Sequence, residues 1–174
     1  MRDDCPAILA IYNDAVLTTT ASYDYEPRTL EHRQEWFDAH QRDDYAIFVA
    51  EEASSVGPGR IIGWSALNKF HDRMGYRFTA ENSVYVAAEA RGRGVGAALL
   101  GPLVSAAQVR GLHAILAVID AQNEASLRLH AKFGFEQVGH LREVGFKLDR
   151  WLDVIYMELR LRNEASAHNK TGWV

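Results

Sequence analysis

The first quarter of the chain carries apolar residues at helical spacing. Apolar side chains recur every three to four residues over 4–17, and Asp4 stands at the position of an N-cap, so we expect a first helix that ends near residue 17. Residues 18–27 combine small polar residues with turn formers and predict a loop. Thr29 follows this loop and precedes a second amphipathic stretch, which predicts a second helix capped by that threonine.

Strand patterns replace helical spacing in the middle of the chain. Residues 45–51 and 60–69 are two apolar runs separated by turn-forming sequence at 54–59, and this order predicts an antiparallel hairpin. Residues 83–88 show a further strand pattern, which stops at the glycine-rich segment 91–96. The chain therefore changes from helices to strands before these glycines.

The rest of the chain alternates helix and strand. The sequence predicts a helix, a buried strand, a helix and a closing antiparallel pair at residues 95–110, 112–120, 123–133, 135–145 and 151–159. Gly101 and Pro102 lie inside the first of these helices and are expected to bend it, because proline removes a helical hydrogen bond. This order of elements predicts one domain built on a mixed α/β sheet.

Composition narrows the class of protein. The 174 residues include 19 Lys and Arg against 23 Asp and Glu, a net charge of −4, and no dense basic block, so we expect no nucleic-acid or membrane partner. No apolar run approaches the roughly 18 residues of a membrane span. The single cysteine, Cys5, has no cysteine to pair with, which fits a reducing compartment, and we expect a cytoplasmic protein.

The segment from Arg91 to Gly96 is the strongest chemical signal. Glycines allow a tight turn and close approach of the backbone, and the N–H groups at the following helix start bind phosphate oxygens, so the segment predicts a pyrophosphate cradle. Gly92, Gly94 and Ala97 also match the loose dinucleotide fingerprint, with Asp120 as a ribose-binding acid. Only one crossover follows the motif, which makes this second interpretation the weaker one.

Three segments together carry a family resemblance. The Arg-x-x-Gly-x-Gly segment at 91–96, the Asn123-x-x-Ser126 pair and the run LHAKFGF at 129–135 resemble the GCN5-related N-acetyltransferase (GNAT) family. Over about residues 4–160 the chain resembles its phosphinothricin and methionine sulfoximine acetyltransferases. The resemblance implies a single-domain GNAT fold of class α/β, with a mixed central sheet splayed at the cofactor site and flanking helices. We expect this domain over 1–162 and a polar tail over 163–174.

The resemblance also implies acetyl-CoA as the acetyl donor. Its pantetheine arm is expected to pair like an extra strand with the backbone of residues 84–86, and its pyrophosphate to lie on residues 92–97. The implied cofactor site comprises Val84, Tyr85, Val86, Arg91, Gly92, Arg93, Gly94, Val95, Gly96, Ala97, Asn123 and Ser126.

Acetyl transfer to an amine needs a base, an oxyanion donor and an acid. Glu81 matches the glutamate proposed as general base in the subgroup, and it is predicted to lie just before the strand that begins at Ser83. His130 stands where many members of the family carry a tyrosine that protonates the departing thiolate, and the subgroup shares this histidine. A histidine flanked by leucines on a helix is otherwise most often a packed core residue. The backbone N–H of Val86 is the expected oxyanion donor.

An amino-acid-like acceptor carries a carboxylate, for which arginine is the expected partner. The predicted acceptor-binding residues are Arg73, Tyr76, Glu81, Asn82 and Tyr25, with Tyr23 as a further candidate for the pocket wall. His71 stands where some members carry Arg or Lys, which leaves the identity of the carboxylate ligand open. The histidines show no metal-ligand spacing, so we expect no metal.

The leading hypothesis is an acetyl-CoA-dependent N-acetyltransferase that acts on the amine of a small molecule such as phosphinothricin or methionine sulfoximine. A non-catalytic acyl-CoA sensor and a nicotinamide-dependent oxidoreductase are the alternatives. Homodimers are common in the subgroup, and the apolar strand at 151–159 could serve such an interface. One departure from the family is the start of the chain, where MRDDCP takes the place of the usual first strand.

Overall fold

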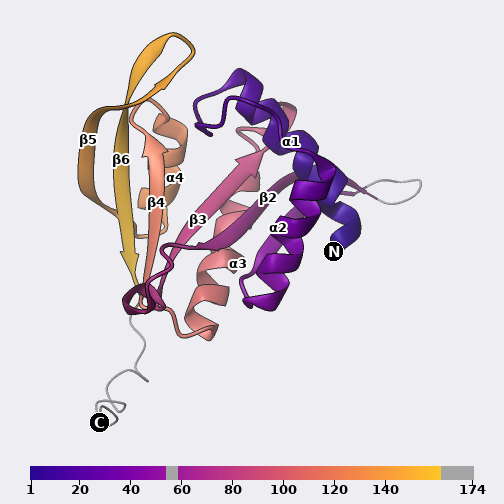
Figure 1. The fold of residues 1–174 in the computed structure, drawn as a ribbon, viewed down its shortest axis with the longest axis horizontal. Coiled ribbons are helices and arrows are strands. Elements are labelled where there is room, and N and C mark those ends of the chain that lie inside the picture. Colours follow the sequence, from indigo (N-terminus) through magenta and orange to yellow (C-terminus); the bar gives the residue numbers. More distant parts are fainter. Residues whose placement is uncertain (54–58, 162–174) are drawn as a thin grey trace.

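A six-stranded mixed sheet in the order β1-β2-β3-β4-β6-β5 forms the centre of a single α/β domain in the computed structural model, which describes residues 1–53 and 59–161 (Figure 1). The strands are β1 (Ile47–Glu52), β2 (Arg60–Lys69), β3 (Thr79–Val86), β4 (Ala114–Asp120), β5 (Glu136–Lys147) and β6 (Arg150–Arg160). The helices are α1 (Cys5–Thr18), α2 (Leu30–Arg42), α3 (Val95–Val109) and α4 (Glu124–Lys132). The predicted α/β class and the predicted order of elements are confirmed.

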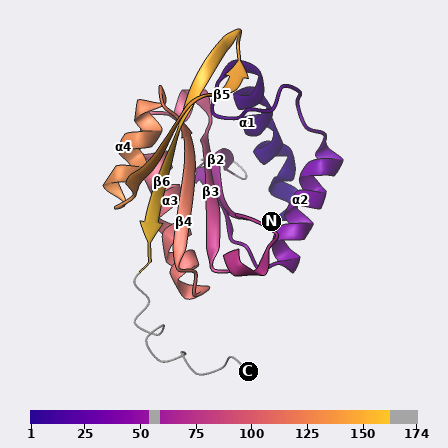
Figure 2. The ribbon, with the colours of Figure 1, turned by 60° about the vertical axis from the view of Figure 1, so that its left-hand side comes forward.

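The helices cover the two faces of the sheet as separate layers. Figure 2 shows α1 and α2 on one side of the strands and α3 and α4 on the other. Side chains alternate between these layers along β2: Trp64 and Ala66 pack with Ile8 of α1, whereas Leu67 packs in the cluster that contains Leu100 of α3. The sheet is therefore buried on both faces at β2, with a separate apolar cluster on each face.

The sheet is splayed at its centre, as expected from the family resemblance. β3 and β4 are parallel and pair only at Thr79, Ala80 and Glu81 of β3. Beyond Glu81, β3 stays paired with β2, and β4 stays paired with β6, so a gap opens between β3 and β4 (Figure 1). Backbone groups along this gap have no strand partner, which makes the gap the natural place for a ligand.

β3 begins at Thr79, not at residue 83 as the sequence pattern predicts. Ala80 is fully buried, and the two residues after it alternate between the faces. Glu81 and Asn82 are polar, so they hide the strand from a search for apolar alternation, although both lie inside it. The prediction that Glu81 precedes the strand is therefore wrong, because the strand begins four residues earlier than predicted and contains Glu81 as its third residue.

The helix caps follow the sequence at one helix and not at the other. The Oγ1 of Thr29 accepts a hydrogen bond from the backbone N–H of His32 at 3.2 Å and caps α2 as predicted. Asp4 occupies the N-cap position of α1 but makes no side-chain cap, because its carboxylate pairs with the N-terminal ammonium. α3 runs without interruption through Pro102, and the bend expected there stays a prediction.

Two further expectations concern the ends of the domain. Within the described residues no strand precedes α1, and Arg2–Asp4 form a short 3₁₀ turn. β6 lies between β4 and β5, so both of its backbone edges are occupied by strands of the same chain. Of the described helices, none has the length and apolar character needed to span a bilayer. The turn predicted at 54–59 and the tail predicted at 163–174 fall mainly or wholly outside the described residues.

Candidate active site

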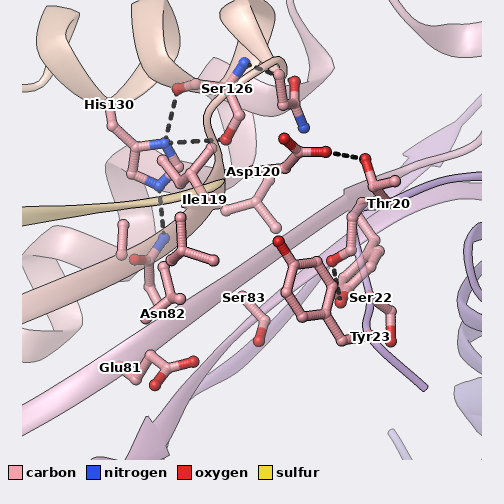
Figure 3. Close-up of a pocket in the computed structure, with 17 residues that line it drawn as sticks. Thr20, Ser22, Tyr23, Glu81, Asn82, Ser83, Ile119, Asp120, Ser126 and His130 are labelled. Atoms are coloured by element: carbon pink, nitrogen blue, oxygen red, sulfur yellow. Dashed lines mark hydrogen bonds between the residues drawn. The ribbon is translucent and has the colours of Figure 1, made fainter. Parts of the chain in front are cut away.

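A cavity of about 320 Å³ fills the gap where β3 and β4 diverge (Figure 3). Its walls come from β3, β4, the start of α4 and the loop between α1 and α2. The lining residues are Thr20, Ala21, Ser22, Tyr23, Glu81, Asn82, Ser83, Val84, Tyr85, Ala117, Val118, Ile119, Asp120, Asn123, Ser126, His130 and Val154. The predicted residues Glu81, Asn82, Val84, Tyr85, Asn123, Ser126 and His130 are thus brought together in one place.

Glu81 and His130 reach the cavity from opposite faces of the sheet. Side chains alternate along β3, so Glu81 shares the α1/α2 face with Ser83, while Asn82 points to the α3/α4 face and meets His130 (Figure 3). Burial raises the pKa of the Glu81 carboxyl group above its ordinary value, and no neighbouring charge contributes to the shift. A carboxylate of raised pKa is a stronger base, which suits a group that removes a proton from an amine.

The hydrogen bonds of His130 fix which nitrogen carries the proton. Nδ1 lies 2.8 Å from the backbone oxygen of Ser126, which can only accept, so Nδ1 is the protonated nitrogen of the neutral ring. Nε2 then accepts from the side-chain amide of Asn82 at 2.8 Å. Burial lowers the pKa of His130 and favours the neutral form. The neutral ring therefore has no proton on Nε2 to donate to a ligand.

Asn82 leaves one buried polar atom without a partner. Its Oδ1 has no hydrogen bond among the described residues, although only 7% of the residue is exposed. A buried acceptor without a partner is costly, and a donor on a bound ligand would satisfy it.

Backbone N–H groups of β3 also point into the gap between β3 and β4. Because the Ala87 N–H bonds Ile62 of β2 at 2.9 Å, the N–H groups of Val86 and Val84 point the other way, toward the gap.

The glycine-rich loop lies between the end of β3 and the start of α3. Gly92 and Gly94 have φ angles of +73° and +84°, in the left-handed region that favours glycine, and Gly94 is the N-cap of α3. The first N–H groups of α3 have no acceptor within the helix, which fits an anion at this end. Arg91 fastens the loop to β3 through a 3.2 Å bond from its Nε to the Val86 oxygen.

Arg93 pairs with Glu52 of β1 at 2.5 Å and is exposed. Val95, Gly96 and Ala97 form the first turn of α3, so the segment predicted to hold a pyrophosphate is one continuous loop and helix start. These residues and Val86 do not line the cavity itself. Asn123 caps α4 by accepting from the Ser126 N–H at 3.1 Å.

The loop between α1 and α2 closes one side of the cavity and is fastened by strands that are distant in sequence. The hydroxyl of Thr20 donates to the carboxylate of Asp120 at the end of β4 (Figure 3). The ammonium of Lys147 donates to the Ser22 oxygen, and Lys147 is itself buried, which lowers its pKa. These contacts hold Tyr23 against the cavity, as the sequence suggests for this ring.

Three predicted acceptor-binding residues lie outside the cavity. Arg73 and Tyr76 are exposed in the segment between β2 and β3, and neither lines a described cavity. Tyr25 is 64% exposed, and its hydroxyl bonds the backbone oxygen of Phe146. Positions on loops gave no sequence signal for direction, because only strand and helix spacing indicates which way a side chain points.

Sequence reasoning missed several lining residues, namely Thr20, Ser22 and Ser83. Ser83 could have been found from strand alternation, since it lies two residues beyond Glu81. Asp120, considered as a ribose-binding acid, instead has both oxygens engaged, by Thr20 and by the N–H of Gln122 at 2.9 Å. Among the residues that the structure describes, no three potential metal ligands cluster.

Comparisons with known proteins found similar sequences and similar solved structures. A model of the acetyltransferase (GNAT) family matches residues 8–135. An L-methionine sulfoximine/L-methionine sulfone acetyltransferase of Pseudomonas paraeruginosa is 44% identical over 164 residues, which cover 94% of this chain and 93% of that protein. A crystal structure of an N-acetyltransferase from Staphylococcus aureus Mu50 has a TM-score of 0.88 at 44% identity and covers 93% of this chain and 95% of its own. That of a phosphinothricin acetyltransferase from Sinorhizobium meliloti, in complex with acetyl-CoA, has a TM-score of 0.91 at 32% identity, covering 99% of this chain and 91% of its own.

Proposed function

The chain belongs to the GNAT family of acetyltransferases, in the subgroup of the phosphinothricin and methionine sulfoximine enzymes, and from this premise we propose its acceptor and its chemistry. It transfers an acetyl group from acetyl-CoA to the free amine of a small amino-acid-like molecule such as methionine sulfoximine or phosphinothricin. The observation that carries the proposal is the half-buried carboxylate of Glu81, which has no partner among the described residues and lines a cavity whose walls come from both faces of the sheet.

Acetyl-CoA supplies an acetyl thioester when it is bound. The chain offers it the unpaired edge of β3 over residues 84–86 and the glycine loop and helix start over residues 91–97. Free N–H groups at the helix start and the unpartnered Oδ1 of Asn82 support this assignment, because both are polar groups that a ligand would satisfy.

Glu81 acts as the general base. An amine reaches the site as an ammonium ion, and the Glu81 carboxylate removes one proton from it, directly or through a water molecule. The Val86 N–H donates to the acyl oxygen that gains negative charge during transfer. Because this N–H already points into the gap, it is oriented for that role before any ligand arrives.

His130 acts through Asn82. The neutral imidazole holds the Asn82 amide by its Nε2 lone pair, which fixes the direction of Oδ1 in the cavity wall. We therefore assign His130 as a positioning residue rather than as the acid that protonates the departing thiolate. The C–S bond breaks as the C–N bond is made, and the CoA sulfur leaves as a thiolate that takes up, through water, the second proton lost by the amine nitrogen. Asn123 and Ser126 complete this wall, where Ser126 Oγ lies 3.3 Å from His130 Nδ1.

A homodimer in the cytoplasm is part of the proposal. Exposed apolar side chains of the β5–β6 hairpin support a dimer, namely Val138, Leu141, Val144, Phe146 and Trp151. The free buried thiol of Cys5 suits a reducing compartment. Sedimentation equilibrium measures the assembly, with a mass near twice 19.5 kDa expected and a mass of one chain as the contrary result.

CoA release from acetyl-CoA, followed with a thiol reagent, tests the function. The acceptor panel contains methionine sulfoximine, methionine sulfone, phosphinothricin, glutamate, an aminoglycoside, a polyamine and a lysine peptide. We expect turnover with the first three, with the N-acetyl product identified by mass spectrometry. Tight acetyl-CoA binding without turnover of any acceptor would overturn the proposal in favour of an acyl-CoA sensor.

A further inference from the structure

A second cavity lies beside the first, between the α1/α2 layer and the sheet. Its volume is about 190 Å³, and it shares Ser83 and Tyr85 of β3 with the cavity that contains Glu81. Asn68 of β2 forms part of its wall and links the two spaces, because its Nδ2 donates to Ser83 Oγ at 3.0 Å and to the Glu81 backbone oxygen at 3.3 Å. The two cavities are therefore neighbours along one face of β3.

The guanidinium of Arg33 lines this second cavity from α2. Arg33 is only 4% exposed, and aromatic rings surround it: its Cζ lies 4.6 Å from the ring centres of Tyr12 and Trp36 and 5.3 Å from that of Trp64. No hydrogen bond or ion pair joins this guanidinium to any described residue, and its Nε is buried without a partner. Ring faces attract the positive charge but do not accept the in-plane N–H groups.

The other charged groups of the cavity leave the charge of Arg33 uncompensated. Asp24 is held by two 2.9 Å bonds from Arg28 and a 2.6 Å bond from the Tyr12 hydroxyl. Although burial alone would raise the pKa of Asp24, the bonds from Arg28 and Tyr12 lower it, so it stays ionised and paired. The other titratable side chains of the lining are His32, Tyr12 and Tyr85. With one acid and two arginines, the cavity carries an excess positive charge, and a buried charge without a counterion is costly.

We propose that Arg33 binds the carboxylate of the amino-acid-like acceptor, so that the acceptor's amine is directed toward Glu81. A carboxylate matches the planar donors of a guanidinium with two parallel hydrogen bonds and supplies the missing negative charge. Glu81 and Ser83 lie on one face of β3, about 7 Å apart, and Ser83 lines both cavities, so a ligand that contacts Arg33 and Glu81 would lie along this face of the strand. This inference rests on the proposed function, because it assumes that the acceptor is an amino acid.

Arg33 differs in kind from Arg73, the arginine predicted from the sequence. Arg73 is exposed and lies outside both cavities, whereas the Arg33 site is already desolvated and rigidly packed by three aromatic side chains. A charge-assisted hydrogen bond is stronger where water is excluded. Arg33 therefore fits the role of a specificity-determining group better than a solvated arginine does.

The test compares each acceptor with its carboxamide, which keeps the amine and loses the negative charge. For the wild type we expect a much lower KM with the carboxylate. Arg33→Met keeps the stem of the side chain and should raise KM for the carboxylate by about 100-fold, while KM for the carboxamide stays within about threefold. Arg33→Lys keeps the charge and should retain part of the preference. Arg42→Met removes an exposed arginine from the same helix and should leave both values unchanged.

The outcomes separate this inference from the proposed function. Equal changes in KM for carboxylate and carboxamide would show that Arg33 only packs the two layers, and loss of the preference in Arg73→Met alone would move the site to that residue. Calorimetry of acceptor binding provides a readout that does not need turnover. Binding that depends on Arg33 without acetylation would leave the inference standing and overturn the proposed function. Turnover with an undiminished carboxylate preference in Arg33→Met would leave the proposed function standing and overturn the inference about Arg33.

Discussion

The side-chain amide of Asn82 and the Nε2 of His130 are 2.8 Å apart, and this hydrogen bond joins β3 to α4 across the cavity. Asn82 donates and His130 accepts, because the imidazole proton is held on Nδ1 by the Ser126 oxygen. Because His130 accepts this hydrogen bond, it acts as a positioning residue for the Asn82 amide.

A double-mutant cycle on Asn82 and His130 tests whether His130 positions the Asn82 amide or acts as an independent acid. If His130 acts through Asn82, His130→Ala and Asn82→Ala should each lower kcat/KM by about tenfold, and the double variant should lose no more than the worse single variant. Circular dichroism checks the fold of each variant. Losses that multiply, together with a change of the alkaline limb of the pH profile in His130→Ala alone, would make His130 an independent acid.

Gly94 has a matched control at the far end of α3. Gly94 and Gly111 have φ angles of +84° and +78°, and a Cβ at either position would meet open space, so alanine should cost about 1 kcal/mol of stability at both through backbone strain. Only Gly94 lies at the predicted pyrophosphate site. We expect Gly94→Ala to weaken acetyl-CoA binding about tenfold by calorimetry and Gly111→Ala to leave it unchanged. Equal acetyl-CoA affinities in the two variants would show that the loop at Gly94 does not bind the cofactor.

Gly145 of β5 determines the position of Tyr23 in the cavity wall. A Cβ at Gly145 would overlap the Tyr23 ring, whereas a Cβ at Gly139 of the same strand would lie 3.5 Å from Tyr156, an ordinary contact. Gly145→Ala should therefore displace Tyr23 and raise the acceptor KM about tenfold, since a small misplacement in a pocket is costly. Acetyl-CoA affinity should not change, and Gly139→Ala should behave like the wild type. An unaltered acceptor KM in Gly145→Ala would remove Tyr23 from the acceptor site.

Glu81 makes stability depend on pH in a direction that follows from its burial. Burial raises the pKa of Glu81 in the folded protein, so the folded state holds a proton over a pH range in which the unfolded chain has released it. Stability contributed by the protonated form is present below the ordinary glutamate pKa and is lost as the pH rises through the raised value. Glu81→Gln avoids this loss. Its melting temperature should exceed that of the wild type at pH 8 and approach it at pH 4, and a difference independent of pH would contradict the account.

Much of the fold follows from local patterns in the chain. Apolar periodicity predicts the four long helices and the β1–β2 and β5–β6 pairs, and the Thr29 side chain marks the start of α2. The start of β3 was missed for a physical reason. Polar residues inside a strand are unusual unless a cavity receives them, and Glu81 and Asn82 both line the cavity beside β4, from opposite faces of the sheet.

Only part of the candidate site could be predicted from the sequence. Glu81, Asn82 and His130 were identified through a resemblance, and strand alternation then explains their opposite faces. Arg33 gave no such signal, because an arginine on an amphipathic helix normally lies in solvent. It is buried here since Tyr12, Trp36 and Trp64 converge on it from two helices and a strand. Such convergence exists only in the folded chain.

The most direct test of the account is the kcat of Glu81→Gln, measured with saturating acetyl-CoA and methionine sulfoximine across pH. The variant keeps the shape of the side chain and removes the base. We expect kcat to fall by about 10² to 10⁴ and the acidic limb of the pH profile to disappear, with acetyl-CoA affinity retained. A kcat equal to that of the wild type, with the acidic limb still present, would show that Glu81 is not the base and would contradict the mechanism.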